Sequence, residues 1–250
     1  MKIIQGVEML EVEMEVFGQK TMIHPTLVWD EEHAILIDAG MPGMSADIQA
    51  AIERAGIPHG TLDTVIVTHQ DIDHFGGVAE LLQDLSTKVY AHEMDRPYLD
   101  GTKHPIKMDL RLIGEHLKKL PEQIRKQVEH LCANPPKIVI DEELSDGQML
   151  DVCGGITVIH TPGHTPGHIC LYLNSNRTLV SADALESMNG KLKGPNPHNT
   201  PDMQSAIKSL SKLLSFKIDR IICYHGGLCD DHPETQLREL INDLQQKVKV

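Results

Sequence analysis

Residues 64–77 read TVIVTHQDIDHFGG, and this stretch decides the fold. The β-branched run at its start is typical of a buried strand, and the glycine pair at its end precedes the apolar residues of a helix. Between them lies an exposed loop with four side chains that can bind a metal: His69, Asp71, Asp73 and His74. Two imidazoles and two carboxylates are more than one tetrahedral ion can use, so the loop predicts two metal ions.

An isolated loop of this composition could also be a solvated turn, but three later segments repeat the pattern. They read TPGHTPGH at residues 161–168, LVSADA at 179–184 and IICYHGG at 221–227. Each places His or Asp at the end of an apolar, strand-like run. Because parallel strands deliver side chains to a common edge of a sheet, we expect these residues to meet there.

With these segments, and with ILIDAG at residues 35–40, the chain resembles the metallo-β-lactamase-fold hydrolases over nearly its whole length. The resemblance implies an α/β (α+β) fold, a four-layer αβ/βα sandwich with the ligand loops on one edge. Strands that first alternate with hairpins and then with helices agree with that architecture.

The resemblance also implies a dinuclear metal site. His69, Asp71 and His164 would hold the first divalent ion, and Asp73, His74 and His225 the second, with Asp183 as the bridge. Asp73 would also orient a metal-bridging hydroxide, which makes it the expected catalytic residue.

Five further residues are candidates for the edge of the site. Asp38 and His168 match family positions that support the site without binding metal. Lys193 and His198 lie in a Pro/Gly-rich loop after Asp183, where His198 is either a proton donor or substrate ligand, or a solvated loop residue. Tyr224 either donates a proton to the developing oxyanion or is packed.

Position 71 departs from the usual family motif, H-x-H-x-D-H, because it carries Asp where the second His is expected. Three carboxylates and a hydroxide cancel the four positive charges of two divalent ions, whereas His would leave one positive charge. Such a site should acidify its water less and prefer Mn²⁺ or Fe²⁺ over Zn²⁺. The alternative is that Asp71 faces solvent and only one metal binds.

Composition predicts a single domain over residues 1–250. The net charge of −13 weighs against nucleic acid and anionic membranes as partners and favours a small molecule, with a homodimer left open. The absence of a signal-like or membrane-spanning segment predicts a cytoplasmic protein. Five cysteines without framework spacing predict reduced thiols, and Cys229 is the one candidate for a place near the site.

Periodicity predicts elements at the following positions. Strands are expected near residues 25–29, 34–38, 64–68, 88–91, 137–140, 156–160, 169–173, 178–182 and 219–223. Helices are expected near residues 44–54, 76–85, 107–131, 202–214 and 234–247. The segment from about 94 to 136 is a helical insertion, interpreted either as a roof over the metal site or as an ordinary packing pair.

The predicted function is hydrolysis of a small ester, thioester or lactone. Two alternatives of other classes stay open. The carboxylate at position 71 favours a diiron redox enzyme like the flavodiiron proteins, although the chain lacks their flavodoxin domain. The other alternative is a non-catalytic metal-binding relative.

Overall fold

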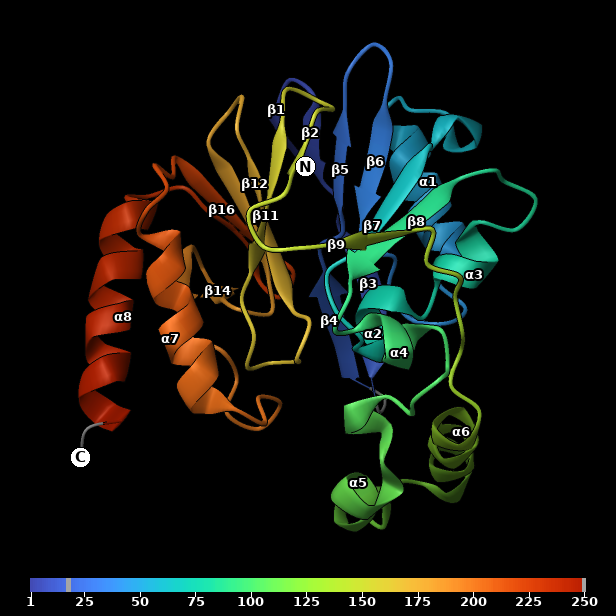
Figure 1. The fold of residues 1–250 in the computed structure, drawn as a ribbon. Helices are drawn as coiled ribbons and strands as arrows, with labels where there is room; N and C mark the ends of the chain where they lie inside the picture. Colours follow the sequence, from blue (N-terminus) through green and yellow to red (C-terminus); the bar gives the residue numbers. More distant parts are fainter. Residues whose placement is uncertain (17–18, 249–250) are drawn as a thin grey trace.

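The computed structural model describes residues 1–16 and 19–248, in which two mixed β-sheets pack face to face between outer helices (Figure 1). This is the helix–sheet–sheet–helix arrangement that the resemblance implied, so the predicted fold class is confirmed. Among the described residues, no helix is both long and apolar enough to cross a membrane.

The first sheet carries the strand that leads into residues 69–74. Its order is β1 (Lys2–Ile4), β2 (Val7–Met9), β5 (Thr26–Trp29), β6 (Ala34–Ile37), β7 (Thr64–Val67), β8 (Lys88–His92) and β9 (Glu142–Leu144). The four strands from β6 to β9 are parallel, while the pairs from β1 to β6 are antiparallel.

The second sheet carries the remaining candidate ligands. Its order is β10 (Met149–Leu150), β11 (Ile156–His160), β12 (Ile169–Leu173), β13 (Thr178–Ala182), β16 (Arg220–Cys223) and β17 (Gly227–Cys229). Only β13 and β16 pair in parallel. Two separate hairpins lie beside the sheets: β3 (Val12–Val16) with β4 (Gln19–Ile23), and β14 (Glu186–Met188) with β15 (Lys191–Lys193).

Helices cover the outer face of each sheet (Figure 1). Those of the first half are α1 (Ser45–Arg54), α2 (Ile72–Phe75), α3 (Val78–Leu81) and α4 (Arg96–Leu99), with a 3₁₀ turn at His59–Thr61. The insertion adds a 3₁₀ turn at Ile106–Met108, then α5 (Leu110–Leu117) and α6 (Glu122–Ala133). The last two, α7 (Met203–Leu213) and α8 (Pro233–Val248), lie side by side over the second sheet.

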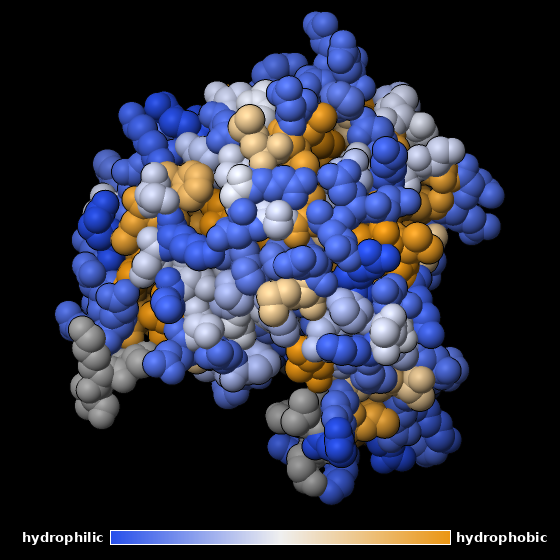
Figure 2. Space-filling model, in the orientation of Figure 1, coloured by the Kyte–Doolittle hydropathy of each residue, from blue (hydrophilic) through white to orange (hydrophobic). Residues whose placement is uncertain are grey.

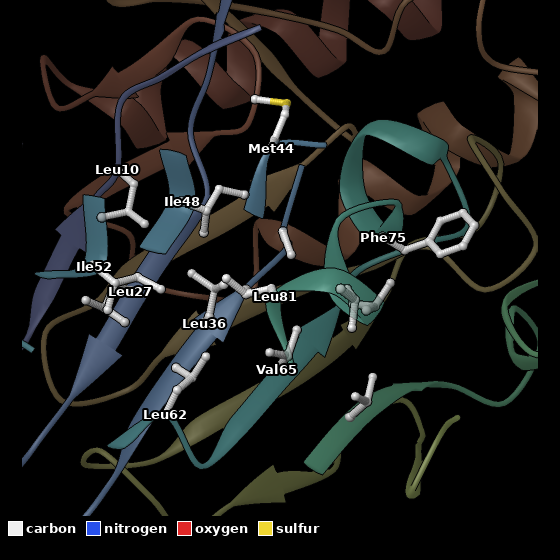
Figure 3. Close-up of a cluster of buried hydrophobic side chains, with 14 of the residues drawn as sticks. Leu10, Leu27, Leu36, Met44, Ile48, Ile52, Leu62, Val65, Phe75 and Leu81 are labelled. Carbon is white, nitrogen blue, oxygen red and sulfur yellow. The ribbon is translucent and has the colours of Figure 1, made fainter. Parts of the chain in front are cut away.

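Successive side chains of a strand point to opposite faces of the sheet, so each strand of the first sheet contributes to two layers of the core. Leu36 of β6 packs with the helices, where Figure 3 shows it below Ile48 and Ile52 of α1. Its neighbours Ile35 and Ile37 face the other way, into a cluster shared with the second sheet. A strand buried on both faces must be apolar throughout, as β6 and β7 are. This burial fixes where the strand ends deliver polar side chains.

The glycine pair after residue 75 opens a helix as predicted, because Gly77 is the N-cap of α3. A Cβ at Gly77 would lie 2.2 Å from the carbonyl oxygen of Ala39, and one at Gly76 would lie 2.4 Å from Pro42, so the pair also allows close backbone approach. The helix is shorter than the predicted 76–85, since it ends at Leu81, and the short helix α2 precedes the pair. As a consequence Asp73 and His74 lie on a helical turn, not in an open loop.

Two further predicted elements are wrong. Residues 137–140 do not form a strand: the amide of Ile138 donates to Leu99 instead of to β8, and pairing with β8 begins at Glu142. The predicted helix over 107–131 is divided because Pro121, in extended conformation, starts α6.

Candidate metal centre

The seven candidate ligands all lie at the carboxyl ends of strands, on one edge of the sandwich. Residues 69–74 follow β7, His164 follows β11, Asp183 follows β13 and His225 follows β16. Their ligand atoms fall into two groups, within each of which all atoms lie within 4.8 Å of one another. The first group is His69, Asp71, His164 and Asp183, and the second group is Asp73, His74 and His225.

In the first group, two carboxylate oxygens face two imidazole nitrogens. Oδ2 of Asp71 lies 2.9 Å from Nε2 of His164 and 3.4 Å from Nε2 of His69. Oδ2 of Asp183 lies 3.3 Å and 4.0 Å from the same two nitrogens. With metal–ligand bonds of about 2.1 Å, neighbouring ligands of a tetrahedral ion lie about 3.4 Å apart. The four atoms have that spacing.

The second group is joined to the first by Asp183. Its other oxygen, Oδ1, lies 3.2 Å from Nε2 of His74 and 3.4 Å from Nε2 of His225. Oδ2 of Asp73 lies 3.2 Å from His225 and 3.9 Å from His74. Asp183 thus directs one oxygen at each group, which is the geometry of a bridging carboxylate.

Buried atoms without partners show that these groups fit metal ions. Nε2 of His69, Nε2 of His74 and Oδ1 of Asp183 are buried and have no hydrogen-bond partner within the described residues. An unsatisfied buried polar atom is costly, and three of them pointing into one space are typical of a site built for a ligand. Neutral imidazole nitrogens and carboxylate oxygens are the donors that divalent first-row metals take.

Asp38 fixes the orientation of His74. It has a left-handed backbone (φ 62°), and its carboxylate accepts from the backbone amide of Thr68 at 2.8 Å and from Nδ1 of His74 at 2.8 Å. Because a carboxylate can only accept, Nδ1 of His74 carries the proton, which leaves Nε2 for the second group. The supporting position implied by the resemblance is where the structure places Asp38.

His168 forms a hydrogen bond with the backbone of Asp183. Its Nε2 accepts from the backbone amide of Asp183 at 3.2 Å, so its proton resides on Nδ1, which lies 2.8 Å from the hydroxyl of Thr161. Burial, together with the neighbouring rings of His69 and His164, lowers the pKa of His168 well below its ordinary value. The ring therefore stays neutral and holds the backbone of Asp183 in place.

Neighbouring opposite charges offset the unfavourable effect of burial on the charged side chains of the two groups. Burial alone would raise the pKa of Asp183, but the rings of His225 and His74 hold it well below its ordinary range. Burial alone would lower the pKa of His225, but the carboxylates of Asp183 and Asp73 raise it to about 9. In the protein without metal, protons on these rings supply the positive charge that divalent ions would otherwise provide.

Asp71 is not in an exposed loop, as the sequence suggested: its side chain is 12% exposed. The ammonium of Lys107, from the insertion, donates to Oδ2 of Asp71 at 2.5 Å and to Nε2 of His164 at 2.6 Å. Burial alone would raise the pKa of Asp71, but Lys107 and the nearby rings hold it well below its usual range. The alternative in which Asp71 faces solvent does not fit this geometry.

Two residues that no sequence motif pointed to are Lys107 and Asp95, and Asp95 accepts hydrogen bonds from two of the ligand loops. It is fully buried and accepts from the backbone amide of Gln70 at 3.0 Å, from its side-chain amide at 3.1 Å, from the hydroxyl of Thr165 at 2.6 Å and from the amide of Gly167 at 2.7 Å. Neither Asp95 nor Lys107 lies in a motif, so only their place in the predicted insertion pointed toward them.

None of the other candidates is among the residues of the two groups. Lys193 and His198 are exposed, and Cys229 is buried in the core cluster between the second sheet and its helices. Tyr224 is packed against the ring of His74, and its hydroxyl donates to the backbone carbonyl of Asp73 at 2.5 Å. Of its two interpretations, the packed one agrees with the structure.

The comparisons with known proteins agree with this geometry. The family model described as the metallo-beta-lactamase superfamily matches residues 20–225. The chain is 30% identical over 233 residues to Probable metallo-hydrolase YflN of Bacillus subtilis, covering 86% of this chain and 84% of that protein. It is 25% identical to hydroxyacylglutathione hydrolase GloC of Haemophilus influenzae, and the match covers 87% of this chain and 92% of that protein.

Among solved structures, one similar fold is a metallo-beta-lactamase family protein, TTHA1429, from Thermus thermophilus. The two superpose with a TM-score of 0.74 at 22% identity, over 99% of this chain and 82% of that one.

Proposed function

Because the chain belongs to the metallo-beta-lactamase superfamily, we propose that it is a hydrolase that binds two divalent metal ions and cleaves a small ester, thioester or lactone. The first ion would be held by the first group, the second ion by the second group, and Asp183 would be shared. The single observation that carries this proposal is the division of the Asp183 carboxylate between the two groups.

Two divalent ions bound there would supply a water acidic enough to attack near neutral pH and would polarise the carbonyl of the substrate. Asp73 lines the cavity beside the site, so its carboxylate is placed to accept a hydrogen bond from the attacking water and to orient it. Asp38 and His168 keep the ring of His74 and the backbone of Asp183 in place while this occurs.

The donor types support a proposal for the metals. Asp71 adds a third carboxylate to the site, and harder oxygen donors favour Mn²⁺ or Fe²⁺ over Zn²⁺. In this structure the ammonium of Lys107 contacts the same atoms of Asp71 and His164 that would bind the first ion, so Lys107 would have to move aside when that ion binds.

The substrate class rests on charge and on the relatives. With a net charge of −13, the protein is unsuited to nucleic acids, and an uncharged carboxylic ester or thioester fits better. The relatives support only the reaction class: one is named as a hydroxyacylglutathione hydrolase, which indicates a thioester, and another as a probable metallo-hydrolase.

A hydrolysis panel with the metal-loaded protein tests the proposal. Esters, thioesters and lactones should be cleaved after loading with Mn²⁺, Fe²⁺ or Zn²⁺, and treatment with a chelator should abolish turnover. Asp183→Asn should lower affinity at both groups by at least about 100-fold and abolish turnover with it. Asp219→Asn, a surface change in the second half, is the matched control.

Two results would contradict hydrolysis. Consumption of O₂ or NO by the iron-loaded protein without hydrolysis would identify the diiron redox class. Tight binding of metal with no turnover on any member of the panel would identify a binding protein. If Asp183→Asn keeps both metals and full activity, Asp183 is not the bridge.

A further inference from the structure

A cavity of about 620 Å³ adjoins the two groups of candidate ligands. Asp71 and Asp73 form part of its wall, so any molecule whose reacting group lies at the metal site extends into this space. Volumes of this size are typical of sites that enclose small molecules. At roughly 30 Å³ for each water-sized group, it has room for roughly twenty non-hydrogen atoms.

The apolar part of the wall draws on four separate segments. Met14 comes from β3, Met41 from the loop after β6, and Met108 from the 3₁₀ turn of the insertion. The fourth segment, α6, contributes Ile124, Val128 and Leu131, which recur at the spacing of one helical face. In Figure 2, apolar side chains come to the surface where the α5–α6 segment meets the rest of the molecule.

The polar residues of the wall include Gln70, Asp71, Asp73 and Lys107 among or beside the candidate metal ligands, and Glu15, Gln127 and Asn199. Among the described residues that line the cavity, Lys107 is the only cation, and it is already paired with Asp71. These described residues therefore offer no unpaired positive charge to a phosphate or a carboxylate. A substrate with a charged carrier, such as a nucleotide or a glutathione, would leave its charges uncompensated against apolar walls.

From these observations we infer that the cavity binds the unbranched aliphatic acyl chain of the substrate, with α6 as its outer wall. This inference rests on the proposed hydrolysis and specifies its substrate as an uncharged ester, thioester or lactone whose acyl chain fits within the room for roughly twenty non-hydrogen atoms. Methionine side chains are unbranched and adapt to irregular space, so the preference for chain length is graded instead of limited to one length.

A series of p-nitrophenyl esters tests this on the metal-loaded protein. Each methylene buried against the wall raises kcat/KM by about two- to fourfold, so decanoate should exceed hexanoate by at least about tenfold. Val128→Trp fills the cavity and should reduce the ratio of decanoate to acetate turnover by at least about tenfold. Lys126→Trp, on the opposite side of α6 and 68% exposed, should leave that ratio unchanged.

Equal kcat/KM for all chain lengths, or the same decanoate-to-acetate ratio in wild type and Val128→Trp, would overturn the inference. A measurement without turnover separates it from the proposed function. By isothermal titration, decan-1-ol should bind the wild-type protein at least about tenfold more tightly than hexan-1-ol does. If no ester is hydrolysed but this difference holds, the function is wrong and the acyl site stands. If both alcohols bind equally, the acyl site is wrong.

Discussion

Asp71 and Lys107 act as a pair, and this changes what a substitution at position 71 should do. Asp71→His alone places an imidazole against the ammonium of Lys107, which already contacts His164. The single variant should therefore lose affinity for the first metal. Replacing both residues removes the repulsion and rebuilds the usual family site.

We expect Asp71→His with Lys107→Met to bind Zn²⁺ in preference to Mn²⁺ by roughly tenfold more than wild type does. Competition between the two metals, read by elemental analysis after gel filtration, measures this preference. Lys107→Met alone is the control, because it keeps the carboxylate. An unchanged preference in the double variant would show that Asp71 does not bind the first metal.

The histidine rings of the two groups predict how stability depends on pH: the metal-free protein should become less stable as pH rises, while the stabilisation by bound metal should increase. Without metal, burial lowers the pKa of His225, but Asp183 and Asp73 raise it to about 9. A group with a raised folded-state pKa stabilises the fold fully below its unfolded value of about 6.5, and this stability is lost as pH rises through the folded value.

The unfolding free energy of the metal-free protein should therefore fall between pH 6.5 and 9, by up to about 1.4 kcal/mol per pH unit for each such ring. Metal binding displaces these protons, so the stabilisation by metal should grow over the same range. Urea unfolding with and without a chelator, at intervals across this range, checks both slopes. A metal-free protein that becomes more stable toward pH 9 would contradict the assignment.

At the scale of elements, the connections between strand ends are as important as the strands. Asp95 follows β8, yet it holds the loop after β7 and the loop after β11 through four donors. Gln70 lies between His69 and Asp71, and Thr165 follows His164, so the two loops that carry three of the four residues of the first group depend on this one carboxylate.

Asp95→Asn replaces one carboxylate oxygen with an amide nitrogen, which cannot accept the hydrogen bonds that the neighbouring N–H and O–H groups donate. It should lower the unfolding free energy by about 2–4 kcal/mol and reduce the affinity of the first group for its metal ion by about 10–100-fold. Denaturant unfolding and a chelator titration measure the two effects. The matched change Asp100→Asn, on a partly exposed residue of the same insertion, should cost less than about 1 kcal/mol. Equal effects of the two changes would rule out a special role for Asp95.

The same elements show what the sequence could predict. The β-branched run of β7 and its polar ending are local signals, so the strand and the position of residues 69–74 could be found by pattern. Short edge strands such as β1 and β10 have only three and two residues, which is too few to show an alternating pattern, although each pairs with the next strand along the chain. Lys107 and Asp95 belong to no motif, and their roles arise only when the insertion folds back over the site.

At the scale of the whole molecule, each group of ligands draws on both sheets. His69 and Asp71 of the first group follow the first sheet, while His164 and Asp183 follow the second. The second group likewise combines His74 with His225. Two metals would therefore join the two halves of the sandwich at one edge, and their binding would add to its stability.

Metal stoichiometry tests this claim most directly. The protein, loaded with Mn²⁺, Fe²⁺ or Zn²⁺ and freed of excess metal by gel filtration, should contain about two ions per chain by elemental analysis, and Asp183→Asn should contain markedly fewer. A folded wild-type protein that retains no metal, or that saturates at one ion, would contradict the dinuclear site.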